Sequence, residues 1–260
     1  MQVHDRLSNL VTLKEILAPA QAHGYAVGAF SPRLTPLILP VLETGQRLHA
    51  PLIVQISQTE LNRAGISPAA FAREFYAQMR AKQITVPVVL HLDHSKELEI
   101  IADAISVGFT SVMIDASDKP LEENIALTRR VVDYAHARGV SVEGEIGRIG
   151  ATDKLETGSD VEGLTDPEEA RRMAEETGVD ALAVSVGTAH GLYTRQPPHI
   201  DFERIAAIHA RTPVPLVLHG GSDVPAELIR KAVQLPGGGV SKINIATDLE
   251  IAMLQALSRD

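Results

Sequence analysis

The chain has 260 residues, 45% hydrophobic and only 3% aromatic, a size and composition that suit one globular domain over residues 1–260. The formal net charge of −9 argues against general binding to nucleic acids or anionic membranes, and no apolar run approaches the roughly 20 residues that span a bilayer. The absence of cysteine excludes disulfides and thiolate metal sites, and it fits a cytoplasmic protein.

Short apolar runs alternate with longer segments of helical pattern along the chain. Several of these runs are β-branched and apolar on both faces, which is typical of parallel strands covered by helices. Eight strand–helix units and an extra N-terminal helix favour an α/β fold of the closed (β/α)8 TIM barrel type, with an open doubly wound sheet as the main alternative. The expected strands are Ala26–Phe30, Pro51–Ile56, Val86–Leu92, Ser111–Ile114, Ser141–Ile146, Ala181–Val186, Pro215–Leu218 and Lys242–Ile245.

Several of the intervening segments carry recognisable helix signals. Thr12 and Glu15 have the spacing of a capping box. Proline follows Ser67 and Asp166, where it suits the first position of a helix. A helix is also expected from Thr128 to Arg138, with the following glycine as its C-cap.

Polar side chains gather at the carboxyl ends of the expected strands. In a closed barrel these ends meet at one rim, where barrel enzymes build their active sites. The sequence therefore predicts an active site at this rim. The polar residues at these ends are His91, Asp93, His94, Asp115, Glu143, Glu145, His190, His219, Asn244, Thr247 and Asp248.

Three histidines from different strand ends suit a catalytic zinc site. Such a site takes three protein ligands and leaves one position open, and neutral imidazole is a good ligand. His94, His190 and His219 each lie beside a glycine or serine, which allows substrate and backbone to approach closely. Any one of them alone also fits a hydrogen-bonded or solvated side chain, but the set of three favours the metal site.

The third expected strand ends with Leu90-His91-Leu92-Asp93-His94. Two histidines and an aspartate at a strand end are costly to bury unless they are paired or bind a metal. Strict alternation would place His91 with Asp93 and leave His94 on the opposite face. Asp93 and His94 therefore share a pocket only if the strand bends or ends there, which we assume.

Two strand–helix turns have features that suit phosphate. His219-Gly220-Gly221-Ser222 follows the seventh strand, and Asn244-Ile245-Ala246-Thr247 leads into the last helix. The glycines free the backbone to wrap an anion, and the helix N-terminus adds positive potential. Barrel phosphate sites favour these two loops, although ordinary capped turns have the same composition.

Five motifs, in order, resemble the class II fructose-bisphosphate and tagatose-bisphosphate aldolase family. The likeness runs from about Leu13 to Glu250, and five ordered motifs are far more specific than one. The motifs are Leu90–His94, Ser141–Gly147, Val186–Tyr193, Leu216–Asp223 and Lys242–Thr247.

The resemblance implies an aldehyde-lyase that reversibly cleaves a ketose phosphate or bisphosphate to dihydroxyacetone phosphate and an aldehyde, through a zinc-stabilised enediolate. It implies that His94, His190 and His219 bind Zn2+, that Asp93 exchanges a proton with the aldehyde half, and that Glu145 lies near the metal. It also implies a homodimer or homotetramer and an associated monovalent cation, Na+ or K+. The positions that match dihydroxyacetone phosphate binding are Gly191, Gly220, Ser222, Asn244 and Thr247.

The loop from Gly150 to Gly163 is expected to be a mobile lid that carries the base for the carbon next to the ketone. Asp153 occupies nearly the position of the family's loop carboxylate, and Glu156 has the matching side chain. We favour Asp153 slightly, because its place in the lid sets its reach. Both also fit solvated loop charges.

Three features depart from the family pattern. Ser31-Pro32-Arg33 stands where the family usually has asparagine, and the loop just described lacks the usual acidic run. The sequence stops at Asp260, before the segment that often carries an arginine motif for the second phosphate. An aldehyde half that carries another group, or none, is therefore a credible alternative to a second phosphate.

Other functions remain open from the sequence. A metal-dependent hydrolase on the same barrel would commonly open with a His-x-His pair on the first strand, which Gly28–Ser31 lacks. A phosphosugar epimerase or isomerase also needs an enediolate to be stabilised. The altered loop favours a non-catalytic phosphosugar-binding protein, whereas Asp93 and the three histidines favour an enzyme. No lysine is placed as an obvious Schiff-base nucleophile, and Lys242 is interpreted as a rim or structural residue.

Overall fold

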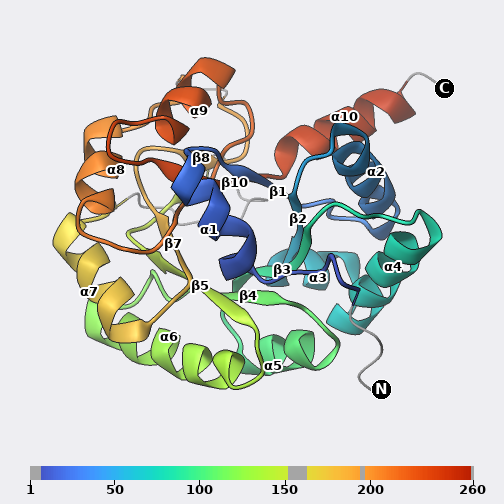
Figure 1. Cartoon of the computed structure of the whole chain (residues 1–260), viewed down its shortest axis with the longest axis horizontal. Coiled ribbons are helices and arrows are strands. Elements are labelled where there is room, and N and C mark those ends of the chain that lie inside the picture. The colour runs from blue at the N-terminus through green and yellow to red at the C-terminus, as the bar shows by residue number, and fades with distance from the viewer. Residues whose placement is uncertain (1–6, 152–162, 194–196, 259–260) are drawn as a thin grey trace.

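A closed barrel forms the centre of the protein. A computed structural model describes residues 7–151, 163–193 and 197–258. Within these residues eight parallel strands close in the order β1-β10-β9-β7-β5-β4-β3-β2, with helices around the outside (Figure 1). Closure between β1 and β10, where Val27 lies opposite Lys242 and Phe30 opposite Ile245, excludes the open sheet. The predicted (β/α)8 barrel is confirmed.

Every expected strand overlaps one strand of the barrel. Most of these strands are buried along their length, because the barrel core covers one face and the helices cover the other, whereas β1 alternates between buried and half-buried residues. Two further strands of two residues, β6 (Gly150–Ala151) and β8 (Ala189–His190), form a small parallel sheet of their own. The barrel strands are β1 Val27–Phe30, β2 Leu52–Ser57, β3 Val88–Ser95, β4 Ser111–Ile114, β5 Ser141–Ile146, β7 Ala181–Val184, β9 Leu216–Leu218 and β10 Val240–Ile245.

The predicted helix starts are confirmed by the caps. Thr12 and Glu15 form a capping box, and Ser67 and Asp166 cap helices whose first residue is proline. None of the helices in the described ranges is long and apolar enough to cross a membrane. The helices are α1 Leu13–His23, α2 Ile38–Leu48, α3 Gln58–Ala64, α4 Pro68–Ala81, α5 Leu98–Ser106, α6 Leu121–His136, α7 Pro167–Thr177, α8 Phe202–His209, α9 Ala226–Val233 and α10 Thr247–Leu257, with the 3-10 turn η1 Thr35–Leu37 before α2.

The bounds expected for the sixth helix were wrong at both ends. The helix begins at Leu121, seven residues before Thr128, and its C-cap is Ala137, which keeps right-handed dihedrals. Gly139 takes the left-handed conformation, with φ 68°, two residues beyond that cap. The chain therefore uses this glycine in the turn after the helix, where a positive φ is needed.

The N-terminal helix α1 closes one end of the barrel. Leu13, Ile16 and Leu17 are buried against barrel residues such as Val89 and Val217, in a cluster separate from the outer core. The helix lies across the strands in the centre of Figure 1. The functional site is consequently confined to the opposite rim, where the carboxyl ends of the strands lie.

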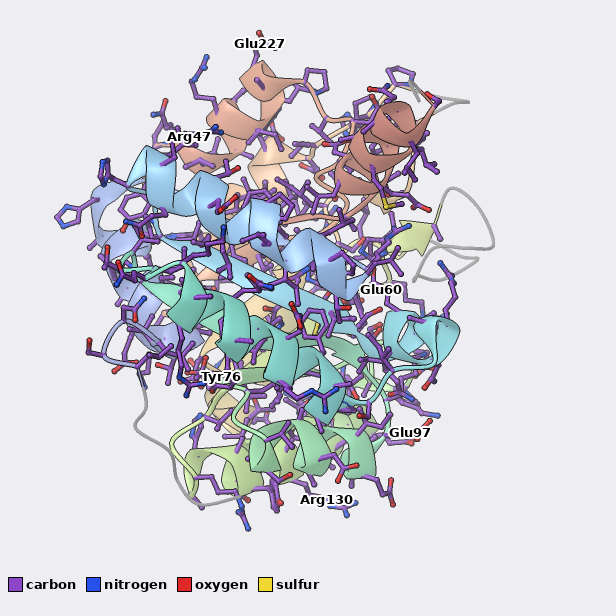
Figure 2. All side chains as sticks on the ribbon, turned by 90° about the vertical axis from the view of Figure 1, so that its right-hand side faces the viewer. Arg47, Glu60, Tyr76, Glu97, Arg130 and Glu227 are labelled. Atoms are coloured by element: carbon purple, nitrogen blue, oxygen red, sulfur yellow. The ribbon has the colours of Figure 1, made fainter. Side chains whose placement is uncertain are left out.

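The outer helices carry the charges. Figure 2 shows Arg47, Glu97, Arg130 and Glu227 extending from the outer surface, and all four are exposed. Glu60, on α3, is 9% exposed and lies on the side of that helix that faces the strands' carboxyl ends. A buried carboxylate at this place belongs to the site described next.

Candidate active site

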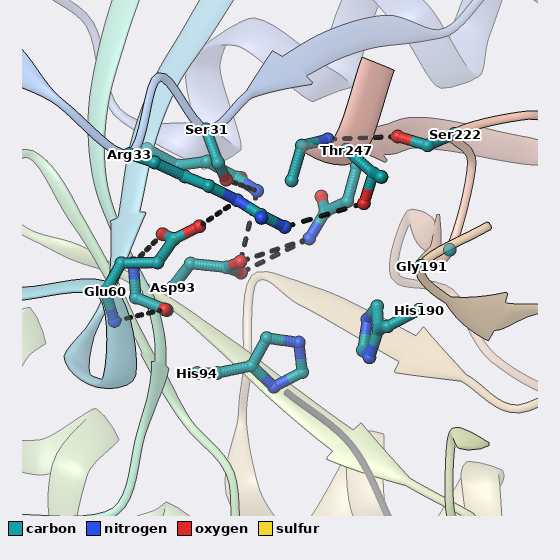
Figure 3. Close-up of a pocket in the computed structure, with 14 residues that line it drawn as sticks. Ser31, Arg33, Glu60, Asp93, His94, His190, Gly191, Ser222 and Thr247 are labelled. Carbon is teal, nitrogen blue, oxygen red and sulfur yellow. Dashed lines mark hydrogen bonds and ion pairs between the residues drawn. The ribbon is translucent and has the colours of Figure 1, made fainter. Parts of the chain in front are cut away.

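One pocket opens at the carboxyl ends of the strands (Figure 3). The residues that line this pocket come from a stretch of more than 200 sequence positions, and the closed barrel brings the ends of their strands together. Most of the residues predicted for the site line it. The lining residues are Ser31, Arg33, Gln55, Ser57, Glu60, Asp93, His94, His190, Gly191, Gly220, Ser222, Asn244, Ala246 and Thr247.

The bend assumed at the end of the third strand is present. His94 has φ 28°, and the pairing of β3 with β4 shifts between Leu92 and Ser95, where β3 holds one extra residue. Such a bulge turns consecutive side chains to the same side. Asp93 and His94 therefore both reach the pocket, which strict alternation forbids.

The histidines predicted as ligands lie together. Their ring centroids are 4.6 Å apart for His94 and His219, 5.0 Å for His94 and His190, and 5.6 Å for His190 and His219. One ring nitrogen from each lies within 4.8 Å of the others. Within the described chain, Nε2 of His94 and Nδ1 of His219 accept or donate no hydrogen bond although both are buried.

The remaining nitrogens of two of these rings are held by carboxylates. Nδ1 of His94 lies 3.0 Å from Asp115 Oδ2, and Nε2 of His219 lies 2.9 Å from Glu143 Oε1. A carboxylate behind a histidine orients the ring and leaves the opposite nitrogen as the metal donor. The donor set, three imidazoles without a thiolate, fits zinc.

Negative charge surrounds the histidines. Burial lowers the pKa of His94, but the neighbouring carboxylates, Asp93 first, outweigh burial and raise it to about 10. Burial raises the pKa of Glu145 well above its ordinary value, and its Oε2 lies 3.6 Å from His219 Nδ1. Burial lowers the pKa of His219 well below its ordinary value, which keeps this ring neutral. A divalent cation would offset the excess negative charge and replace the proton on His94.

Of the two interpretations given for Lys242, a rim or a structural residue, its position inside the barrel supports the structural one. Its side chain is fully buried, and Nζ donates to Glu143 Oε2 at 2.8 Å. β10 directs this side chain toward the inside of the barrel. Hydrogen bonds therefore connect Lys242 to Glu143 and Glu143 to His219 beneath the pocket. Its structural role is supported by this pairing.

Asp93 is 5% exposed and is fixed from two sides. Gln55 Nε2 donates to Oδ2 at 3.1 Å, and Asn244 Nδ2 donates to Oδ1 at 3.2 Å. Two amide donors orient the carboxylate while it still faces the pocket beside His94 (Figure 3). This geometry suits a group that exchanges a proton with a bound molecule.

The two loops expected to bind phosphate are linked to each other. Ser222 Oγ accepts hydrogen bonds from the backbone N–H groups of Ala246 at 3.2 Å and Asp248 at 3.3 Å, at the start of α10. Gly220 has φ 67°, and a Cβ there would lie 2.3 Å from the carbonyl oxygen of Ala189. Gly220 is therefore required where the loop after β9 passes against β8.

Several pocket residues were not predicted from the sequence. Gln55 lies within an apolar strand, and Ser57 and Glu60 cap α3, so none stood out as a strand-end group. Arg33 was noted only as a departure from a family pattern. A capping box directly after a strand was the available signal.

The residues proposed for the loop base, Asp153 and Glu156, lie outside the described residues. The described ends of their loop meet the site. Ala151 is paired with His190, and Arg148 and Gly163 exchange two backbone hydrogen bonds.

Comparison with known proteins identifies the family of this chain. The sequence model for fructose-bisphosphate aldolase class-II matches residues 11–260. The structure is similar to the YdjI aldolase from Escherichia coli K12, with 30% identity over 96% of this chain and 86% of that chain and a TM-score of 0.79. It is similar to a candidate fructose-1,6-biphosphate aldolase from Coccidioides immitis, with 31% identity, the same coverages and a TM-score of 0.83. It is also similar to the fructose-bisphosphate aldolase of Campylobacter jejuni, with 27% identity over 96% of this chain and 81% of that chain and a TM-score of 0.78. This chain belongs to the class II fructose-bisphosphate aldolase family.

Proposed function

We propose that the protein is a zinc-dependent aldolase that reversibly cleaves a ketose phosphate to dihydroxyacetone phosphate and an aldehyde. Family membership supports an aldolase, a carbon–carbon lyase. The observation that carries the proposal is that one ring nitrogen from each of His94, His190 and His219 lies within 4.8 Å of the others, while Asp93 lines the pocket with His94 and His190.

The three histidines would hold the metal, with Asp115 and Glu143 orienting two of the rings. When bound, zinc would act as a Lewis acid that takes up the negative charge developing on the substrate oxygen. Glu145 is close enough to the rings to balance the charge of the cation.

Asp93 is the proposed acid and base for the aldehyde half. In cleavage it would remove the proton from the hydroxyl group beside the breaking carbon–carbon bond, and in condensation it would return that proton to the new hydroxyl. Gln55 and Asn244 keep its carboxylate in place during both directions.

The opposite side of the pocket would bind dihydroxyacetone phosphate. Gly191, Gly220, Ser222, Asn244 and Thr247 line that side, and the N-terminus of α10 supplies positive potential for the phosphate. A sodium or potassium ion at the phosphate and a homodimer or homotetramer rest on the family resemblance. A cytoplasmic location rests on the absence of cysteine, and all of these stay predictions.

The test combines metal analysis with two assays. The purified protein should contain about one zinc per chain and should release dihydroxyacetone phosphate from at least one member of a panel of ketose phosphates. It should also exchange a carbon-bound proton of dihydroxyacetone phosphate with deuterated water. Isomerised product without carbon–carbon cleavage would favour an epimerase or isomerase. Binding without exchange would favour a phosphosugar-binding protein.

A further inference from the structure

The pocket has a second polar end, away from the glycine loops. In Figure 3, Ser222 and Gly191 lie on one side and Glu60 lies on the other, with the Asp93 carboxylate between them, and the side chain of Arg33 extends from the Glu60 side toward Thr247. If dihydroxyacetone phosphate binds beside the glycines, the carbon chain beyond Asp93 extends toward Arg33 and Glu60. These two residues therefore face the aldehyde half of the substrate.

Arg33 is held by carboxylates on two sides. Its Nε lies 3.1 Å from Glu60 Oε1, and its Nη1 donates to Glu250. Its Nη2 also lies 3.5 Å from Thr247 Oγ1, so the guanidinium spans the top of the pocket. The side chains of Arg33 and Glu60 are only 13% and 10% exposed, which makes this a pair within the site rather than a surface ion pair.

Glu60 is fixed by the start of α3. The backbone N–H of Ser57 donates to Glu60 Oε2 at 2.8 Å, and the N–H of Glu60 donates to Ser57 Oγ at 3.1 Å. One carboxylate oxygen thus faces Arg33 and the other occupies a backbone donor. The backbone N–H of Ser57 is therefore engaged, and an anion that approaches Arg33 would meet the Glu60 carboxyl group beside it.

The net charge of Arg33, Glu60 and Glu250 is not positive, whether Glu60 is ionised or protonated. When Glu60 and Glu250 are both ionised, their two negative charges exceed the single positive charge of Arg33 by one. Burial raises the pKa of Glu60, and with Glu60 protonated the charges of Arg33 and Glu250 cancel. Arg33 is the only lysine or arginine among the described residues that line the pocket.

A phosphate at this end would meet an unfavourable field, whereas a hydroxyl group suits it. A hydroxyl can donate to the Glu60 carboxylate and accept from the Arg33 guanidinium. We propose that the Arg33–Glu60 pair determines specificity and selects an uncharged, hydroxyl-bearing aldehyde half that carries no phosphate. This inference rests on the proposed aldolase function and narrows its substrate class to a ketose with one phosphate.

The test compares two acceptors that differ only in the phosphate. Dihydroxyacetone phosphate is condensed with glyceraldehyde or with glyceraldehyde 3-phosphate by the metal-loaded protein, and kcat/KM is measured for each. The unphosphorylated acceptor should be favoured by at least about tenfold. A preference for the phosphorylated acceptor would overturn the inference.

Two variants should move this preference in opposite directions. Glu60→Gln keeps the shape of the side chain and an oxygen for the Ser57 N–H but removes its charge, so it should shift the ratio toward the phosphorylated acceptor by about tenfold. Arg33→Gln removes the cation and should raise the preference for glyceraldehyde. Glu43→Gln, at the exposed ion pair with Lys82, serves as the matched control and should leave the ratio unchanged. If the ratio of the two kcat/KM values is unchanged in both pocket variants, the Arg33–Glu60 pair does not determine the acceptor preference.

Deuterium exchange of dihydroxyacetone phosphate alone separates the two proposals, because it requires no aldehyde. Exchange should persist in the control variant Glu43→Gln at close to the rate of the unaltered protein. If the unaltered protein exchanges normally yet prefers the phosphorylated acceptor, the specificity inference fails and the aldolase function stands. If it neither exchanges nor condenses, the proposed function fails and this inference fails with it.

Discussion

Replacing Lys242 with methionine should weaken both the fold and the metal site. Lys242 Nζ lies 2.8 Å from Glu143 Oε2, and the other oxygen of Glu143 lies 2.9 Å from His219 Nε2. All three side chains are fully buried. Methionine replaces the apolar stem of the side chain as far as Cε but leaves the carboxylate without its lysine partner.

The expected magnitude follows from the geometry of this pair. At an effective dielectric constant of about 20, unit charges 2.8 Å apart attract by about 6 kcal/mol. Removal of the lysine also removes the free-energy cost of burying its charge, which offsets part of this loss. The net loss in the free energy of unfolding should therefore be about 3–5 kcal/mol. Because Glu143 orients His219, the affinity for the metal should fall by about 10- to 100-fold.

Urea unfolding of the metal-free protein, followed by circular dichroism, measures the first effect, and competition with a chelator measures the second. The double variant Lys242→Met/Glu143→Gln leaves no unpaired charge and should recover most of the stability. Lys96→Met, at a pair with Asp118 whose side chains are 58% and 49% exposed, should cost under about 1 kcal/mol. A Lys242→Met protein as stable as this control, or a double variant no more stable than the single one, would refute the reasoning.

Four further predictions concern the pocket and its loops. His190→Ala should remove most of the metal while circular dichroism shows a folded barrel; full zinc occupancy would contradict the ligand assignment. Asp93→Ala should keep zinc and lower turnover by at least about 100-fold, and unchanged turnover would exclude its role. Asp153→Ala should abolish deuterium exchange of dihydroxyacetone phosphate while leaving its binding nearly intact; exchange lost only in Glu156→Ala would move the role to that residue, and exchange in both would place the base in the barrel. Gly220→Ala should lower the free energy of unfolding by about 1–3 kcal/mol in urea, because its φ is 67° and the added Cβ would lie 2.3 Å from a carbonyl oxygen. A neutral result would contradict the strain.

Much of the architecture was accessible from local patterns. The apolar runs predicted the strands, and cap signals at Thr12, Ser67 and Asp166 predicted helix starts, because these features depend on residues near one another in the chain. The prediction that polar strand ends would form one site also needed only the topology, since every carboxyl end of a parallel barrel meets at one rim. Helix ends were less predictable, because a glycine at the cap of α6 and a glycine two residues beyond that cap give the same local sequence pattern.

The geometry of the site was decided by contacts between segments far apart in sequence. β3 holds one extra residue relative to β4, and this bulge directs the side chains of Asp93 and His94 into the same pocket. No local sequence signal distinguishes the bulged strand from a regular one. The inward direction of Lys242 follows from closure of β10 against β1. Arg33 and Glu60 meet because β1 and β2 are neighbours in the barrel, although 27 positions separate them. Alternation and capping are properties of the local chain, whereas register, burial and charge pairing exist only once the sheet has closed.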